Sequence, residues 1–234
     1  MLDTRFWKKY FEVYDLLNIL EPYQTLLQDI REPLGEIEGM KILDAGAGTG
    51  NLAILLSREG ADVVALDFSQ EGLGKYLEKF PSGKTVLHDL TEPLPFDSET
   101  FDTIVSNNTI YTLPKETRPY AFKEFYRILK RGGKIVVSNV HTGFKPIKIY
   151  FAHIGWSLKN KGLGKTMGEV LSLLVPTMKI FYYNSLIIKE HKGNNFAFIG
   201  ENEQKELLES TFFKEISQNK STYANQAILN HAIK

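Results

Sequence analysis

Short apolar runs alternate with amphipathic stretches through the middle of the chain. The runs are rich in Val, Ile and Leu and predict strands, whereas the stretches between them carry apolar positions at helical spacing and predict helices. The predicted order is strand 41–45, helix 50–58, strand 62–67, helix 70–79, strand 84–88, strand 102–107, helix 116–130 and strand 133–139. This alternation predicts a parallel sheet with helices on both faces.

Helical and strand patterns also flank this central region. Before it, Pro22 separates a second helix from a first stripe of aromatic and apolar residues, which consists of Trp7, Tyr10, Phe11, Tyr14 and Leu17. After it, residues 140–200 contain two aromatic helical stretches near 145–158 and 167–182, and segments 212–219 and 223–232 predict strands. The expected fold is α/β: a seven-stranded, mostly parallel sheet with an antiparallel C-terminal hairpin and a helical lid.

A run of glycines follows the first predicted strand. The segment from Lys41 to Gly50 is KILDAGAGTG, so Gly46, Gly48 and Gly50 come directly after the strand end. Glycine lets the backbone approach a ligand without a Cβ, and the loop amides and the following helix N-terminus are expected to face that ligand. A dinucleotide loop has the pattern G-x-G-x-x-G, whereas Asn51 stands where its third glycine would fall. The spacing favours a nucleotide-type cofactor other than a dinucleotide.

Asp44 followed by G-x-G-x-G resembles motif I of the class I S-adenosylmethionine-dependent methyltransferases. Further segments resemble motifs of that family in the same order: Asp67-Phe68-Ser69 at the end of the second strand, His88-Asp89-Leu90 after the third, 101–108 as motif IV, and 125–134 as the R-x-L-K-P-G-G stretch with Arg131 in place of proline. The resemblance covers most of the chain, and it is greatest for the small-molecule group that includes the ubiquinone and menaquinone methyltransferases.

The resemblance implies S-adenosylmethionine as the cofactor and assigns its contacts. Asp67 would accept hydrogen bonds from both ribose hydroxyls, and the Asp89 side chain and the backbone N–H of Leu90 would bind the adenine. Tyr14, in a Tyr-Asp pair typical of the group, would cover the methionine end or else pack in its helix; Asp44 would contact the cofactor or brace the glycine loop. The expected cofactor contacts are Tyr14, Asp44, Ala45, Gly46, Gly48, Gly50, Asp67, Phe68, Asp89, Leu90 and Asn107.

Residues beyond motif IV and in the 140–200 segment are candidates for the acceptor side. By the resemblance, Asn108 and Tyr111 would line it. Tyr150 and Trp156 would form its roof, with packing inside short helices as the alternative. Because such a long excursion from a sheet usually has a function, we expect this segment to cover the substrate.

A catalytic base is optional for this chemistry. Methyl transfer from a sulfonium is an in-line displacement, which depends on alignment more than on acid or base chemistry. If the acceptor is a hydroxyl or an acidic carbon, His141 is the best-placed base, and its alternative role is to fix the start of the 140–200 segment. The other histidines lack the spacing of metal ligands, and we expect no metal.

Composition and charge exclude several classes of function. The chain has no cysteine and lacks the basic-then-apolar start of a signal peptide, so a cytoplasmic enzyme is expected. Its 28 basic and 28 acidic residues give a formal net charge of +0, which argues against nucleic acid as a partner. From His141 to Lys192, however, eight lysines accompany two glutamates. This excess suggests an anionic acceptor or peripheral contact with an anionic membrane, with a solvated lysine face as the alternative.

The functional hypothesis is methyl transfer from S-adenosylmethionine to a small-molecule acceptor that is apolar or anionic, such as a quinone, a lipid or another metabolite. The alternatives are a non-catalytic S-adenosylmethionine-binding protein and a nicotinamide-dependent oxidoreductase. With 234 residues, the chain is long enough for one such domain and short for two. We expect N-terminal helices in 1–35, a cofactor-binding core in 36–140, a helical lid in 141–200, and a terminal helix with the hairpin in 201–234.

Overall fold

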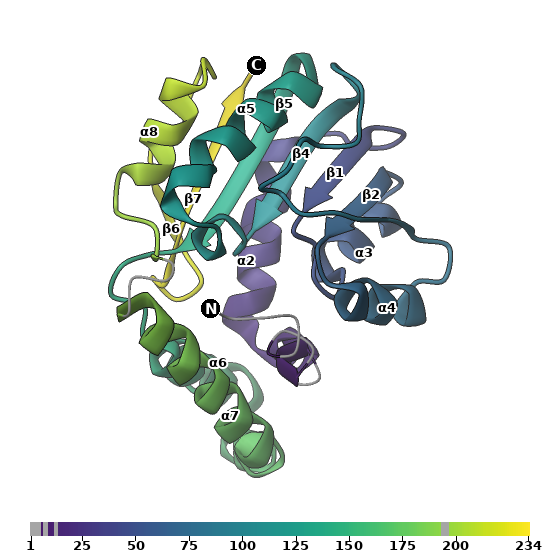
Figure 1. Ribbon diagram of the computed structural model, residues 1–234. Helices are drawn as coiled ribbons and strands as arrows, with labels where there is room; N and C mark the ends of the chain where they lie inside the picture. The colour runs from purple at the N-terminus through teal and green to yellow at the C-terminus, as the bar shows by residue number, and fades with distance from the viewer. Residues whose placement is uncertain (1–5, 7–8, 12–13, 193–196) are drawn as a thin grey trace.

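The computed structural model describes residues 6, 9–11, 14–192 and 197–234, and its sheet confirms the predicted architecture (Figure 1). The strands are β1 (Lys41–Ala45), β2 (Asp62–Asp67), β3 (Lys84–Leu87), β4 (Phe101–Asn107), β5 (Leu129–Val140), β6 (Lys220–Thr222) and β7 (Ala227–Ile233). They form one seven-stranded sheet in the order β3-β2-β1-β4-β5-β7-β6. Strands β1 to β5 pair in parallel, and β7 runs antiparallel to β5 and β6.

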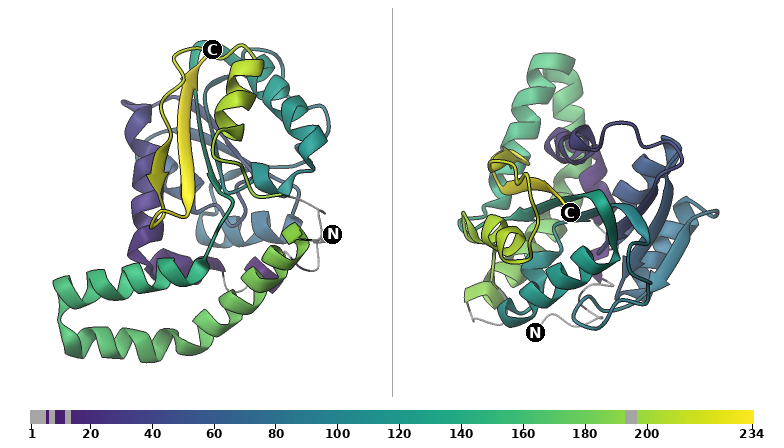
Figure 2. Two further views of the ribbon diagram at one scale, coloured as in Figure 1. Left: turned by 90° about the vertical axis from the view of Figure 1, so that its left-hand side faces the viewer. Right: turned by 90° about the horizontal axis from the view of Figure 1, so that it is seen from above.

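Helices cover both faces of this sheet. Helix α2 (Glu21–Arg31) lies over one face, and α5 (Arg118–Ile128) and α8 (Glu203–Ser210) lie over the other (Figures 1 and 2). Helices α3 (Asn51–Arg58) and α4 (Gln70–Lys79) follow β1 and β2 as predicted. Ile42, Leu43 and Ile104 are fully buried in the central strands. Burial on both faces explains why apolar residues stand next to each other in the middle of these strands, as in Ile42-Leu43 and Ile104-Val105.

The N-terminal segment is helical where the structure describes it. A 3-10 helix (Asp15–Ile19) precedes α2, and Pro22 lies in the first turn of α2, which confirms the predicted division at that residue. Proline is tolerated there because the first helical N–H groups have no intrahelical partner. Trp7 lies outside the described residues.

The C-terminal hairpin is present, but its first strand was predicted too early. Residues 212–219 are not a strand, because Phe212 (φ 69°) and Glu215 (φ 50°) leave the extended conformation. The segment still runs beside β7 through hydrogen bonds in both directions between Lys214 and Ile233, of 2.7 and 2.9 Å. The hairpin turn contains Tyr223, Ala224 and Asn225, all with positive φ, so Tyr223 belongs to the turn.

Between the predicted helix 116–130 and strand 133–139 the chain forms a bulge inside a longer strand. β5 already begins at Leu129, which pairs with Phe101, and the pairing then shifts so that Lys134 is opposite Thr103. Gly132 takes a φ of 72° in the extra length, a conformation that favours glycine.

The 140–200 segment forms a projecting helical hairpin. Its helices are α6 (Pro146–Lys161) and α7 (Leu163–Lys192), the second longer than predicted at both ends. They run side by side away from the sheet (Figure 2). In the described part of the chain, no single helix has the length and apolar composition to cross a membrane. The two halves of α7, Leu163–Val175 and Thr177–Lys189, are bent by 53° relative to each other. They satisfy that criterion only when they are taken together.

Candidate active site

A cavity of about 380 Å³ lies at the carboxyl ends of β1, β2 and β4. The chain passes from β1 to its neighbour β2 on one side and from β4 to its neighbour β5 on the other side. Ligands of open α/β sheets bind at such a switch point, where the strand order reverses. The volume falls in the range of small-molecule sites. The predicted residues that line it are Tyr14, Asp44, Gly46, Gly48, Asp67, Phe68, Asp89, Leu90, Asn107, Asn108 and Tyr111.

The glycine loop after β1 uses its amides within the protein. The N–H groups of Gly46 and Ala47 both donate to the Leu66 carbonyl, at 2.8 and 3.0 Å. The N–H of Gly48 donates to the Asp67 carboxylate at 2.8 Å. The expectation that the loop amides face a ligand is therefore wrong for these three, and the loop presents its side-chain-free surface to the cavity instead.

Glycine in this loop also permits close packing. At Gly46, with φ of 82°, a Cβ would lie 2.2 Å from the Thr109 side chain beyond β4. At Gly50, with φ of 74°, it would lie 2.1 Å from the ring of Tyr76. Gly50 does not line the cavity, and neither does Ala45. Gly50 is thus a packing residue at the start of α3. The direct cofactor contact predicted for it does not agree with its position outside the cavity lining.

Two buried carboxylates lie at the ends of β1 and β2. Asp67 accepts the N–H groups of Gly48 and Ser69, each at 2.8 Å. Asp44 accepts the N–H of Ala53 and so braces α3, while its Oδ2 atom is buried without a hydrogen-bond partner among the described residues. Burial, and secondly repulsion from Asp67, raise the pKa of Asp44 to about 7. Burial raises the pKa of Asp67 to about 6 against the opposing backbone N–H groups. A cation between these groups would favour both carboxylates in their ionised form.

The loops after β3 and β4 supply polar side chains of different kinds. Asp89 is exposed, and its Oδ1 accepts both the N–H and the hydroxyl of Thr91 at 2.8 Å. The Oδ1 of Asn107 is buried, and no described residue hydrogen-bonds to it. Asn108 instead joins two strands, because its N–H donates to Ser138 and its Oδ1 accepts the N–H of Val140. The unpaired Asn107 oxygen, like that of Asp44, can accept a hydrogen bond from a ligand.

Four buried tyrosines and the half-buried Tyr14 form a further part of the cavity lining, which we call the aromatic wall: Tyr10, Tyr14, Tyr23, Tyr111 and Tyr223. Neighbouring rings lie 5.4 to 6.0 Å apart between centroids in the Tyr10, Tyr14, Tyr23, Tyr223 series. Burial raises the pKa of all five phenols, that of Tyr23 to about 12. The wall is therefore neutral at physiological pH.

Asp15 holds the N-terminal segment over the glycine loop. Its Oδ1 accepts the Thr49 hydroxyl at 2.6 Å and pairs with the Lys79 ammonium at 2.9 Å. The same ammonium donates to Asn51 at 2.8 Å. This tether places Tyr14, the adjacent residue, in the wall of the cavity.

Three predicted site residues, the candidate base His141 and the candidate roof residues Tyr150 and Trp156, are not among the residues that line the cavity. The His141 ring nitrogens approach the carbonyl oxygens of Thr142 and Asn225, at 2.6 and 3.1 Å, which supports its alternative role of fixing the start of the hairpin. Tyr150 packs edge-on against Phe181, and Trp156 stacks on His153. Tyr150 thus packs between α6 and α7, whereas Trp156, 38% exposed, lies on the surface of α6.

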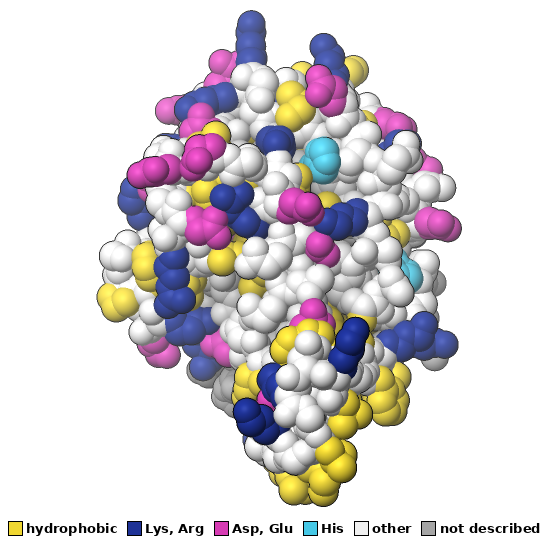
Figure 3. Space-filling model, turned by 180° about the vertical axis from the view of Figure 1, so that it is seen from behind, with side chains coloured by type: hydrophobic (Ala, Val, Ile, Leu, Met, Phe, Trp, Pro, Cys, Tyr) yellow, Lys and Arg dark blue, Asp and Glu magenta, His cyan; other side chains and the backbone are white. Residues whose placement is uncertain are grey.

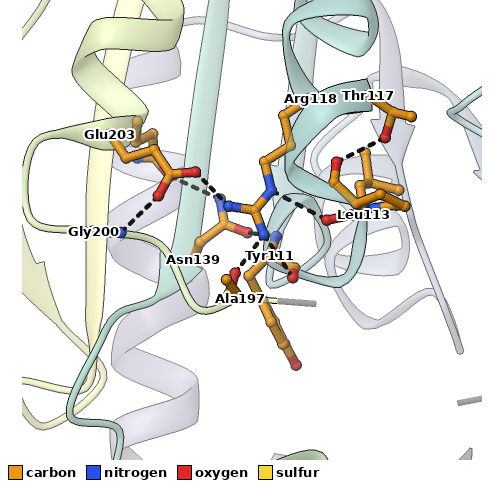
Figure 4. A network of polar contacts seen from close by, with 10 residues as sticks. Tyr111, Leu113, Thr117, Arg118, Asn139, Ala197, Gly200 and Glu203 are labelled. Carbon is orange, nitrogen blue, oxygen red and sulfur yellow. Dashed lines mark hydrogen bonds and ion pairs between the residues drawn. The ribbon is translucent and has the colours of Figure 1, made fainter. Parts of the chain in front are cut away.

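A buried arginine braces the loop that carries Tyr111. Figure 4 shows the Arg118 guanidinium donating to the carbonyl oxygens of Tyr111, Leu113 and Ala197 and pairing with Glu203. Arg118 is 1% exposed, and burial lowers its pKa, against the carboxylate of Glu203. The ion joins the loop after β4, the segment after α7 and the start of α8 into one unit.

Several lining residues were missed at the level of sequence. Phe144 and Asn184 come from the two ends of the hairpin where it joins the body, and Tyr23 and Tyr223 come from α2 and the C-terminal turn. Asn225 tolerates positive φ and is a signal that could have shifted the predicted turn to 223–225. No local signal relates that turn to the cavity. Among the described residues no group of three or more His, Asp and Glu is placed to hold a metal.

Comparison with known proteins identifies relatives of the chain. A family model described as a methyltransferase domain matches residues 42–133. An uncharacterized methyltransferase of Bacillus cytotoxicus is 33% identical over 185 residues, which cover 76% of this chain and 82% of that protein. A demethylmenaquinone methyltransferase of Staphylococcus aureus is 31% identical over 134 residues, 55% of this chain and 54% of that protein. The chain also spans 59% of the length of the Bacillus subtilis relative YqeM, and matches it with 32% identity over 62% of its own length.

Solved structures share the fold over nearly the whole chain. One comes from a Haloferax volcanii complex between the Trm112 methyltransferase activator and a candidate methyltransferase; it covers 97% of this chain and 96% of that chain, with a TM-score of 0.65 and 14% identity. A SAM-dependent methyltransferase from Aquifex aeolicus covers 94% and 92%, with a TM-score of 0.59 and 16% identity. At these identities the likeness establishes the fold.

Proposed function

The chain belongs to the class I S-adenosylmethionine-dependent methyltransferases, and from that premise we propose that it transfers the donor's methyl group to a small apolar acceptor, quinone-like or lipid. The observation that carries the proposal is a single cavity that joins the family's cofactor positions to a wall of neutral tyrosines. The demethylmenaquinone methyltransferase relative agrees with a ring-bearing acceptor.

The polar side of the cavity fits the donor. Asp44 lines the cavity, and no residue that the structure describes hydrogen-bonds to its buried Oδ2, so it can receive the donor's ammonium group. The Asp67 carboxylate accepts the backbone N–H groups of Gly48, Ser69 and Phe68 and has further acceptor capacity for a ribose hydroxyl. The Asp89 Oδ1 is occupied by Thr91, which leaves its other oxygen for the adenine amino group.

The aromatic wall fits an apolar acceptor. Tyrosine rings supply large apolar surface and a face that attracts a cation, so the same wall accommodates a flat apolar ring and tolerates a neighbouring sulfonium. Lysines are absent from the cavity lining formed by described residues, which favours an apolar acceptor over an anionic one.

The chemistry needed is alignment. When bound, S-adenosylmethionine supplies an electrophilic methyl group on a cationic sulfur. The chain's residues hold both reactants and exclude water, which can contribute effective molarities of about 10⁵–10⁸ M. The phenols of the wall stay protonated and act as hydrogen-bond donors, and His141 lies outside the cavity. An acceptor that is already nucleophilic, or that ionises on its own, is therefore the better match.

The test is a labelling experiment with fractionated extract. Purified protein and methyl-labelled donor are incubated with neutral-lipid, water-soluble metabolite, protein and nucleic-acid fractions, and mass spectrometry identifies any labelled product. Label in the neutral-lipid fraction supports the proposal, and label confined to protein or nucleic acid contradicts it.

Calorimetric titration separates the alternative functions. S-adenosylhomocysteine is expected to bind and NADH to show no binding. Binding of S-adenosylhomocysteine without label in any fraction favours a non-catalytic binding protein. Tight binding of NADH alone favours a nicotinamide-dependent oxidoreductase.

A further inference from the structure

Helices α6 and α7 expose large apolar side chains along their length. On α7 these recur every three or four residues, which places them on one side of the helix. They are Leu163, Met167, Leu171, Leu174, Val175, Met178 and Tyr182, each 52 to 70% exposed. Ile147, Phe151 and Leu158 of α6 are 41 to 63% exposed at similar spacing. We call these two sets the apolar stripe.

The apolar stripe is distinct from the face of α7 that packs on the protein. That other face carries Leu173, Ile180 and Ile187, which are 2 to 8% exposed. The hairpin is therefore apolar on the side that holds it together and on a second side that no described residue covers. A row of exposed apolar side chains along a helix, such as the row on α7, marks an interaction surface.

Unpaired lysines accompany the apolar stripe. Lys148, Lys159, Lys165, Lys179 and Lys189 are exposed and form no ion pair with the side chains that the structure describes. Lys161 is bound to Glu169 at 2.6 Å. Figure 3 shows hydrophobic and basic side chains together on the projecting part of the molecule. The surface thus combines apolar area with net positive charge.

This combination identifies the partner by its chemistry. A second copy of the hairpin would place lysines opposite lysines, and like charges across an interface oppose association. An anionic lipid surface offers phosphates for the lysines and an apolar layer just beneath them for the stripe. Long lysine stems reach the headgroups while the neighbouring apolar side chains lie deeper.

We propose that the α6/α7 hairpin docks on the surface of an anionic lipid bilayer, with its apolar stripe at the boundary of headgroups and acyl chains. Docking does not depend on methyl transfer. The hairpin also contributes Phe144 and Asn184 to the cavity, so docking orients the cavity relative to the lipid.

Vesicle flotation tests the docking surface. Full-length protein is floated with phosphatidylcholine vesicles and with vesicles in which about a third of the lipid is phosphatidylglycerol. We expect flotation with the anionic vesicles only. The double variant Leu171→Glu/Met178→Glu is expected to lower the partition coefficient by about 30-fold or more. Lys165→Gln and Lys179→Gln should each lower it by about fivefold, with less binding at high salt.

A matched control separates the stripe from general surface hydrophobicity. Phe212 is 75% exposed and lies outside the hairpin, so Phe212→Glu should leave flotation unchanged. Titration with S-adenosylhomocysteine verifies that each variant retains its fold and donor site. This readout also distinguishes failure of docking from failure of the proposed activity.

Four outcomes overturn the proposal. The first is absence of flotation with anionic vesicles, and the second is a loss of flotation in Phe212→Glu equal to that of the stripe variant. The third is a dimer that requires the apolar stripe and does not bind vesicles. The fourth is protection from protease that shows α7 to cross the bilayer. Flotation that needs both the stripe and the lysines supports it.

Discussion

The proposed donor side and the proposed acceptor side of the cavity are built in different ways. The donor side comes from loops that directly follow β1, β2 and β3, and backbone N–H groups hold its carboxylates. The acceptor side combines side chains from the N-terminal segment, the loop after β4, the hairpin and the C-terminal turn. Strand ends place the first set locally, whereas tertiary packing alone assembles the second.

The two sides are also stabilised by different interactions. On the donor side, main-chain hydrogen bonds fix the glycine loop to β2. On the acceptor side, Arg118 is the buried ion that joins three segments. Substitutions can therefore damage one side and spare the other.

The largest expected effect is on folding stability, at Arg118. Arg118→Met leaves Glu203 and three carbonyl oxygens without their donor, and we expect the free energy of unfolding to fall by about 4 kcal/mol. Urea denaturation measures it. Arg131→Met is the control, because that side chain is 90% exposed and pairs with Glu99 at the surface, so a loss below about 1 kcal/mol is expected. Equal losses would mean that the buried network does not brace the acceptor side.

The next effect is on donor affinity, at Asp67. Asp67→Ala removes the acceptor proposed for the ribose hydroxyls and the support of the Gly48 amide, so S-adenosylhomocysteine should bind about 100-fold more weakly. Asp62→Ala, at the other end of β2, removes a surface pair with Lys84 and should leave affinity unchanged. Calorimetry compares the two variants. If Asp67→Ala retained the wild-type affinity, the donor site would not lie at this strand end.

A smaller effect concerns the pH dependence of donor binding. Asp44 has a raised pKa of about 7, so it is increasingly protonated as the pH falls below that value. If its carboxylate holds the donor's ammonium, the dissociation constant for S-adenosylhomocysteine should rise by up to about tenfold per pH unit below pH 7 and level off above it. Asp44→Asn should remove this step. An unchanged profile in Asp44→Asn would assign the protonation to another group.

The smallest effect is expected at His141. Because its ring nitrogens face backbone carbonyls outside the cavity, His141→Gln should change kcat by less than about twofold. Product formation from the labelled donor measures this ratio once an acceptor is identified. A large loss of kcat, with donor affinity and stability retained, would instead indicate that His141 is the catalytic base for the acceptor.

Sequence patterns brought the residues proposed for the donor to one cavity because their signals are local. The apolar runs of β1, β2 and β4 reflect burial on both faces, and Asp44, Asp67 and Asn107, at or next to the ends of these strands, lie beside one cavity. The loop amides were wrongly assigned to the ligand, since the carbonyl of Leu66 and the carboxylate of Asp67 accept them. A linear pattern does not show which acceptor a backbone N–H meets.

The acceptor side was harder to predict because its residues are distant in sequence. Tyr223 was placed in a strand, and Tyr23 had no predicted role, yet their rings lie 6.0 Å apart. Tyr150 and Trp156 were expected over the cavity because they belong to an aromatic segment, but Tyr150 packs against α7 and Trp156 stacks on His153 at the surface of α6. The aromatic content of a segment indicates that its side chains pack, and only the tertiary structure shows which residues they pack against.

The central claim is that the donor site and the aromatic wall form one catalytic cavity for an apolar acceptor. The most direct test is transfer of labelled methyl into the organic-soluble fraction of an extract, measured side by side for the wild type and Asp67→Ala. The account predicts label in an organic-soluble small molecule with the wild type and almost none with Asp67→Ala. Equal label from both proteins, or label confined to the aqueous macromolecular fraction, would contradict it.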